Sequence, residues 1–140
     1  MHLVLLVSLA LAISQEPEVP DELALPALAH AIEVSAADRV ACVDVRDRAS
    51  PSLFLSRINA PGHKIVSLAD CSWSPKGMIG PAHEHAIKIE LSNLTRKSEF
   101  SVEVTVAWYQ SSADAGHETL ILTRENDAWR VTGSLGKWIT

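Results

Sequence analysis

The second half of the chain alternates between apolar and polar residues, which is the pattern of strands with one buried face. The alternation runs through four segments that are separated by short polar turns. These segments are 85–92, 100–109, 117–124 and 128–139. Four such strands in succession predict an antiparallel meander. Because each strand has one apolar face, the meander needs a cover on that side.

Two helices in the first half of the chain can supply this cover. The first is expected over 23–37, where apolar residues follow the i, i+3, i+4, i+7 spacing of one helical face. These residues are Leu25, Leu28, Ala29 and Ile32. A second helix starts at Ser50-Pro51, a cap followed by a proline in the first turn, and ends before Pro61-Gly62. Its expected apolar face consists of Leu53, Phe54 and Ile58.

Between the helices and the meander, the pattern predicts two short strands and one long loop. The strands are "RVACVDV" at 39–45 and "KIVSLADC" at 64–71. The segment 71–83, "CSWSPKGMIGPAH", is expected to be a loop because it contains two prolines and two glycines. The predicted fold class is therefore α+β, a curved antiparallel sheet with a C-terminal four-strand meander packed on two N-terminal helices. It forms a single domain over 23–140.

The N-terminus is typical of a secretory signal peptide. Residues 3–13 are apolar except for Ser8, a run too short to span a bilayer, which takes about 20 residues. Cleavage before Gln15 would leave 1–14 as the signal peptide and the proline-rich segment 15–22 as a flexible acidic leader. We therefore expect a secreted or periplasmic protein with no membrane span after cleavage. The alternatives are a buried N-terminal segment or an uncleaved anchor.

The chain has two cysteines, Cys42 and Cys71. In an oxidising compartment, two cysteines and no third one favour a single disulfide. Their spacing fits neither a Cys-x-x-Cys redox pair nor a zinc site. The alternative is a pair of buried free thiols.

The formal net charge of −5 makes nucleic acid an unfavourable partner, since an acidic surface repels phosphates. The basic pairs Arg46/Arg48 and Arg96/Lys97 are interpreted as solvated turn residues. No nucleotide-binding or metal-binding motif is present, and we expect no cofactor.

His83, Glu84 and His85 form the densest group of polar side chains with chemical potential. If the strand includes them, both histidines point to the face of Ile87 and Glu84 points to the other. A metal site would need a third ligand, such as His63 or His117, and nothing in the sequence fixes one. We therefore interpret the group as the polar start of a strand, with no metal site.

The segment 118–138, "ETLILTRENDAWRVTGSLGKW", resembles the closing hairpin of the nuclear-transport-factor-2-like (cystatin-like roll) superfamily. The order of helices first and long strands last is also similar. The resemblance implies a cone-shaped sheet around a cavity, a scaffold used by both enzymes and non-catalytic binders. The early strand at 39–45 and the disulfide depart from this pattern.

The expected function is non-enzymatic binding of a partner protein or a small apolar ligand. A ligand pocket would be lined by Trp73, Met78 or Trp108, since aromatic and soft apolar side chains favour such sites. One alternative is a small cone-fold hydrolase or isomerase that uses His85 with a carboxylate, for which Asp44, Asp70 and Glu103 are candidates. Another alternative is a secreted inhibitor or immunity-type protein, which would show a filled core and an exposed tryptophan patch.

Overall fold

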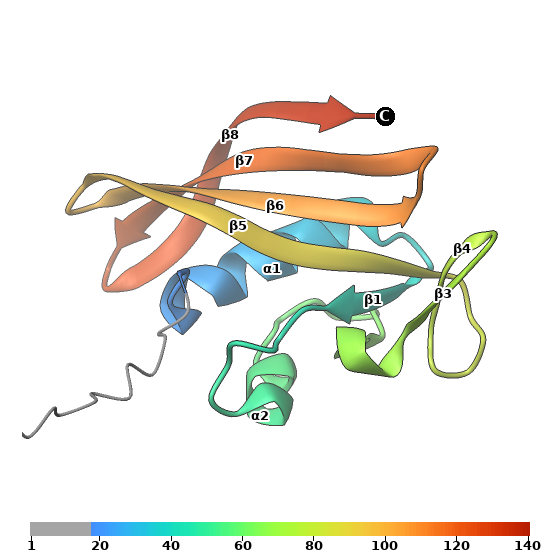
Figure 1. Cartoon of the computed structure of the whole chain (residues 1–140). Helices are drawn as coiled ribbons and strands as arrows, with labels where there is room; N and C mark the ends of the chain where they lie inside the picture. The colour runs from blue at the N-terminus through green and yellow to red at the C-terminus, as the bar shows by residue number, and fades with distance from the viewer. Residues whose placement is uncertain (1–17) are drawn as a thin grey trace, which may run out of the picture.

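The computed structural model describes residues 18–140, so the expected signal peptide and the start of the leader lie outside the described residues. The described residues form two helices, one short 3-10 helix and eight strands, most of which are labelled in Figure 1. In chain order they are α1 (Asp21–Ser35), β1 (Val40–Val43), α2 (Pro51–Ser56), β2 (Ile65–Ser67), η1 (Leu68–Asp70), β3 (Ser72–Ser74), β4 (Gly77–Ile79), β5 (Ala86–Ser98), β6 (Ser101–Ser111), β7 (Asp114–Glu125) and β8 (Ala128–Ile139).

The main sheet has six strands in the order β2-β1-β5-β6-β7-β8. The four long strands β5 to β8 form the antiparallel meander that the period-two pattern predicts, and this part of the prediction is confirmed. β1 lies between β2 and β5 and runs parallel to both. The α+β class with two helices, a mostly antiparallel sheet and one disulfide is therefore correct.

Helix α1 covers one face of the meander, which we call the inner face (Figure 1). It begins at Asp21, so the last two residues of the expected leader belong to its first turn, where their carboxylates favour the positive helix end. Val19, just before the helix, is also buried. The core is filled by side chains from both layers. They are Leu23, Ala24, Ala27, Leu28, Ala31 and Ile32 of α1, and Ile87, Ile89, Val102, Val104, Val106, Leu120 and Leu122 of the sheet.

Helix α2 is shorter than its apolar pattern suggests. Phe54 and Ile58 are buried as expected, but Leu53 is 60% exposed because a helix of 6 residues presents only one side to the core. Ser50 precedes the helix without making a side-chain capping bond. Arg48 was expected to be solvated and is instead buried. Its guanidinium donates to the carbonyl oxygen of Val19 at 2.7 Å and to the carboxylate of Asp21 at 2.8 Å.

The segment 71–83 is not a plain loop, because it contains the antiparallel hairpin of β3 and β4. The hairpin packs against the end of β6 through Gly77. This glycine has φ +124°, and a Cβ at its position would collide with the side chain and carbonyl of Gln110. Met78 is buried in a small second core with Val40, Cys42 and Ala86. The prediction of a loop failed because three-residue strands around Pro75 and Gly77 carry no periodicity.

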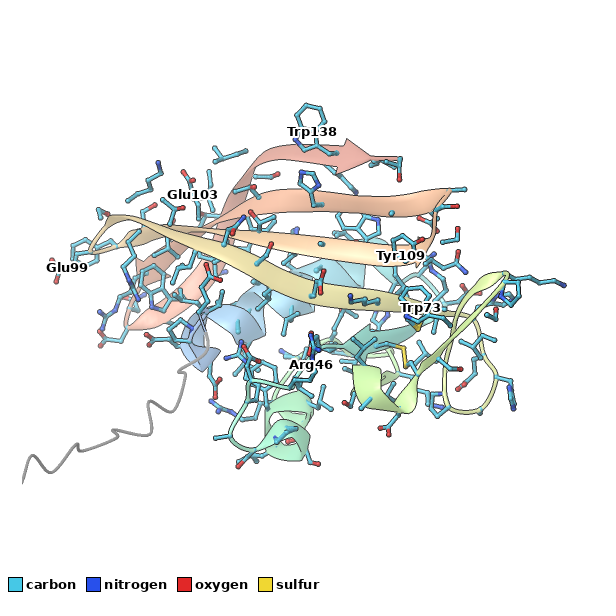
Figure 2. The ribbon with its side chains drawn as sticks, in the orientation of Figure 1. Arg46, Trp73, Glu99, Glu103, Tyr109 and Trp138 are labelled. Carbon is cyan, nitrogen blue, oxygen red and sulfur yellow. A yellow bond between two sulfur atoms is a disulfide. The ribbon has the colours of Figure 1, made fainter. Side chains whose placement is uncertain are left out.

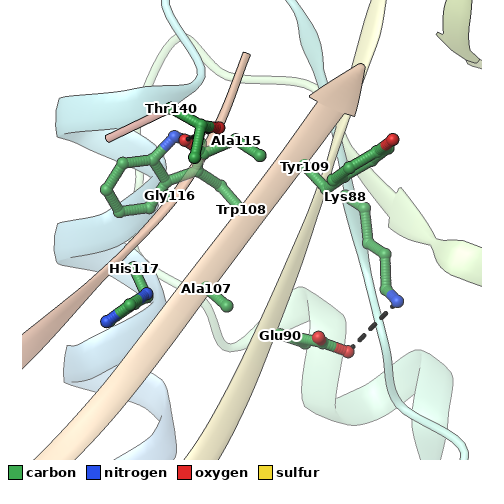
Figure 3. A pocket seen from close by; sticks show the side chains of 9 residues that line it. All are labelled: Lys88, Glu90, Ala107, Trp108, Tyr109, Ala115, Gly116, His117 and Thr140. Carbon is green, nitrogen blue, oxygen red and sulfur yellow. Dashed lines mark hydrogen bonds and ion pairs between the residues drawn. The ribbon is translucent and has the colours of Figure 1, made fainter. Parts of the chain in front are cut away.

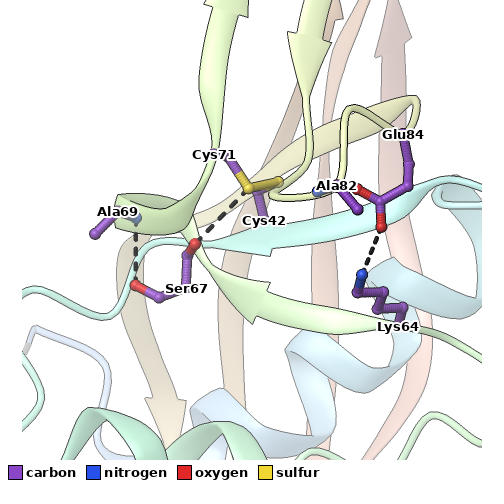
Figure 4. Close-up of a disulfide and its surroundings, with 7 residues drawn as sticks. All are labelled: Cys42, Lys64, Ser67, Ala69, Cys71, Ala82 and Glu84. Atoms are coloured by element: carbon purple, nitrogen blue, oxygen red, sulfur yellow. Dashed lines mark hydrogen bonds and ion pairs between the residues drawn. A yellow bond between two sulfur atoms is a disulfide. The ribbon is translucent and has the colours of Figure 1, made fainter.

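A disulfide joins Cys42 of β1 to Cys71, which follows η1 (Figure 4). The prediction from cysteine count is therefore confirmed. The bridge holds the short parallel strands to the hairpin that follows them. Within residues 18–140, no helix is long and apolar enough to cross a membrane.

Candidate functional site

His83 and His85 do not form a site. β5 begins only at Ala86, and His83 lies before it in a left-handed conformation with φ 61°, so the expected shared strand face does not exist. Both imidazoles are exposed. Across 18–140, no group of three or more His, Cys, Asp or Glu side chains is placed to hold a metal ion.

Glu84 has a structural role in this segment (Figure 4). Its carboxylate forms an ion pair with Lys64 and accepts a hydrogen bond from the backbone N–H of Ala82 at 2.7 Å. The Lys64 hydrogen bond, followed by backbone N–H donors, lowers the pKa of Glu84 to about 2. Glu84 therefore stays ionised and ties the segment before β5 to the segment before β2.

The carboxylates considered as partners of His85 are occupied elsewhere or lie apart from it. Asp44 accepts hydrogen bonds from Arg46, which lower its pKa, and Glu103 pairs with Lys97 at 3.5 Å. No ion pair within the described part of the chain joins His85 to a carboxylate or involves Asp70. The geometry therefore gives no support to a proton-transfer role for His85.

Two other histidines approach carboxylates: His30, which was not among the candidates from the sequence, and His63, which was considered there only as a possible third metal ligand. His30 of α1 lies 3.5 Å from Glu118 of β7, and His63 lies 3.5 Å from Glu33. Glu118 is buried on the inner face, in phase with Leu120 and Leu122. The sequence could have indicated this contact, because Glu118 falls at a position of the alternation that is otherwise apolar, and a charged residue there needs a partner across the core.

His30 also lines a depression of about 370 Å³ between α1 and β8. Its other walls are apolar side chains together with Arg57 and Asn59. Arg57 lies 3.8 Å from Asp21, which already accepts the shorter bond from Arg48. The depression is a mixed polar and apolar surface, and the residues around it mainly join α1 to its neighbours.

The more distinctive concave surface lies on the outer face of the meander, opposite α1 (Figure 3). Two neighbouring rows of paired residues form it. One row runs Lys88, Tyr109, Ala115 across β5, β6 and β7. The next row runs Glu90, Ala107, His117, Trp138 across β5 to β8. We call the depression over these rows the outer depression; its volume is about 290 Å³.

The shape of the outer depression follows from side-chain size along the two rows. Ala107 and Ala115 are small and form its floor, while Tyr109 and His117 rise on either side. The imidazole of His117 stacks on the indole of Trp138 at 6.3 Å between ring centroids. At the β5 end, Lys88 and Glu90 neutralise each other in an ion pair of 3.2 Å. The result is an apolar hollow with an aromatic rim.

The three residues expected to line a ligand pocket have three different surroundings. Trp108 belongs to the inner face and contributes to the lining of the outer depression together with Gly116. Trp73 of β3 is 54% exposed and meets Tyr109 edge-on, with ring centroids 5.1 Å apart (Figure 2). Met78 is buried in the second core and lines neither depression.

No family model, curated protein or solved structure matches this chain.

Proposed function

We propose that this chain is a secreted, non-enzymatic domain that binds a partner protein on the outer face of its sheet. The observation that carries the proposal is the outer depression, an apolar hollow with an aromatic rim on a sheet face that no helix within 18–140 covers. The inner face is filled by α1, so the outer face is where binding surface is available.

The open shape of the outer depression favours a protein side chain over an enclosed small molecule. Ligand pockets usually have volumes of roughly 300–1,000 Å³ and bury most of the ligand. The outer depression, at about 290 Å³, lies at the lower limit of that range, but it is open to solvent and would leave much of a small molecule uncovered. It suits one protruding side chain at the centre of a protein interface, where a few anchors provide most of the binding energy.

The lining also indicates which side chain fits. The floor is methyl groups, the rim is aromatic, and the single charged pair is already neutralised. An aliphatic or aromatic anchor would gain contact there without leaving a charge unpaired. A filled core with exposed tryptophans is also the arrangement expected of a secreted inhibitor or immunity-type protein, which is one class of such binders.

The Cys42–Cys71 disulfide supports the secreted part of the proposal, because structural disulfides persist in oxidising compartments. The resemblance to the nuclear-transport-factor-2-like superfamily stays a prediction, and the proposed function does not depend on it.

The test uses two capped amino acids, N-acetyl-leucinamide and N-acetyl-phenylalaninamide, as stand-ins for an anchor side chain. Titration into the labelled chain should shift the amide NMR signals of Ala107, Ala115 and His117. Replacing Ala107 by Met fills the hollow and should abolish these shifts. The matched variant Ala128→Met, at an exposed position outside the hollow, should retain them. Shifts confined to α1 and the inner face, or unaffected by Ala107→Met, would contradict the proposal.

A further inference from the structure

β8 is the outermost strand of the meander. It pairs with β7 on one side, and its other side has no strand neighbour within the described chain. An edge strand presents a row of unpaired backbone N–H and C=O groups, which another extended chain can pair with. Natural proteins usually protect such edges with bulges, charges or a covering element.

The first part of β8 has that protection, but the last part has little of it. Two register shifts against β7 fall between the pairs formed by Val131 and Gly136, so the strand is irregular there. The second shift skips Leu135, and from Gly136 to Ile139 the pairing with β7 is regular. We call Leu135–Ile139 the edge segment; it contains large exposed apolar residues. Leu135 is 59% exposed, Trp138 70% and Ile139 67%. Trp138 and Ile139 are consecutive, so they expose apolar surface on both faces of the strand.

Gly136 is a second, independent feature of the edge segment. A Cβ built at Gly136 would meet nothing within 4 Å, and its φ lies outside the left-handed region. Neither packing nor backbone conformation within this chain therefore requires glycine at this position. A glycine inside a strand often marks a bulge or a place where another backbone approaches closely. Gly136 borders the register shift at Leu135, and the space around it is open to such an approach.

The charge of the edge segment indicates the occupant. Lys137 is its central residue and its single charged one, and no ion pair within 18–140 involves it. Its ammonium lies over the Trp108 ring at 5.2 Å from the centroid. Two copies of the edge segment paired antiparallel about their centre would place one Lys137 opposite the other, which is unfavourable. A strand with a carboxylate at that position would form an opposite-charge pair instead.

We propose that an extended, acidic segment of a partner protein adds to the main sheet as a seventh strand along the edge segment Leu135–Ile139. The proposal deepens the proposed function and rests on it, because the edge segment borders the outer depression through Trp138, which pairs with His117. Lys137 itself points to the inner face, where it lies opposite Glu118 of β7. Backbone hydrogen bonds would hold the added strand, and Lys137 would select a glutamate or aspartate opposite it.

The probe is a fluorescent peptide of about ten residues, a length typical of strands, with alternating threonine and valine and one central glutamate. Fluorescence anisotropy should show that it binds, and that a matched peptide with a central lysine binds about tenfold more weakly. The variant Lys137→Glu should reverse this preference, which loss of a merely structural lysine would not do. Arg130→Glu makes the same charge change on β8 outside the edge segment, and the preference should persist.

Strand addition is distinguished from charge attraction by two N-methylated versions of the acidic peptide, one methylated at odd and one at even positions. An added strand uses the N–H groups of one parity, so one version should bind and the other should not. Equal binding of both versions, or no effect of Lys137→Glu, would overturn the proposal. Light scattering of the chain alone gives a further test. If it shows a dimer, and Lys137→Glu disrupts that dimer, the proposal is overturned, because the occupant of the edge would be a second copy of the chain. If the peptide does not bind but the capped amino acids still shift the NMR signals, this inference alone is rejected. If the peptide binds but the capped amino acids cause no shifts, the proposed function is rejected.

Discussion

The indole of Trp108 lies directly over the α-carbon of Gly116 on the neighbouring strand. A Cβ at position 116 would lie 2.5 Å from Cζ2 of that ring and would also collide with the carbonyl oxygen of Trp138. Gly116 therefore allows Trp108 and β8 to approach at the end of the sheet where the outer depression is found.

Gly116→Ala should lower the free energy of unfolding by about 1–3 kcal/mol, because both the ring and the β8 backbone must shift to make room. Gly136→Ala is the matched control on β8, and its effect should stay within about 0.5 kcal/mol, since no atom lies within 4 Å of the new methyl group. Denaturant unfolding measures both variants. Equal losses for the two glycines would show that the Trp108 contact does not determine the effect.

The disulfide should contribute about 3–4 kcal/mol to stability, because it joins cysteines 29 positions apart and restricts the unfolded chain. The double variant Cys42→Ala/Cys71→Ala should therefore unfold at lower guanidinium concentration than the oxidised chain. Reduced wild-type protein lacks the cross-link but keeps both cysteine side chains. Comparing its unfolding with that of the double variant separates the loss of the cross-link from the cavity that alanine leaves in the second core. An unchanged midpoint after reduction would contradict this prediction.

Arg48 and Arg46 lie two residues apart, but substitution of Arg48 should lower the free energy of unfolding far more than substitution of Arg46. Arg48→Met removes a buried guanidinium that bonds Val19 and Asp21 and lies over the Phe54 ring at 4.5 Å. We expect a loss of about 2–3 kcal/mol, since the Val19 carbonyl and the Asp21 carboxylate lose their donor. Arg46 has an 83% exposed side chain, so Arg46→Met should cost less than about 1 kcal/mol. Thermal or denaturant unfolding measures the stability loss of each variant. Equal losses for Arg46→Met and Arg48→Met would contradict the prediction.

The pKa of Glu84 should depend on Lys64. In the folded chain this pKa is lowered from its ordinary value of 4.5 to about 2, mainly by the Lys64 hydrogen bond. Because the folded-state pKa is the lower one, this group's contribution to stability is present above about pH 4.5 and is lost as the pH falls toward 2. Lys64→Met should raise the pKa of Glu84 toward 4.5, as followed by NMR titration of its carboxyl carbon. A titration unchanged in Lys64→Met would show that the backbone donors alone hold the carboxylate.

The meander was predictable because a period of two over long segments has few alternative interpretations. Val102, Val104, Val106 and Trp108 are all buried, as the alternation in β6 requires. The hairpin of β3 and β4 was not predictable, because each strand has 3 residues and the stabilising contact of Gly77 with Gln110 is distant in sequence.

The candidate site was only partly predictable, for a related reason. The sequence drew attention to His83 and His85 as neighbours along the chain, and a left-handed residue before β5 removes their shared face. The outer depression depends on which residues of β5 to β8 fall in the same row. That register is set by turns and bulges between strands, and a one-residue change would bring other side chains together.

The position of β1 has a consequence for the order of folding events. β5 to β8 pair with their sequence neighbours, whereas β1 pairs with β5 across the whole segment that holds α2, η1 and the hairpin. Local pairings close before distant ones, so the meander can form while β1 is still free. Once β1 is inserted between β2 and β5, Cys42 is completely enclosed. We therefore expect oxidation of Cys42 to precede the docking of its strand, because the docked strand shields the thiol from an oxidant.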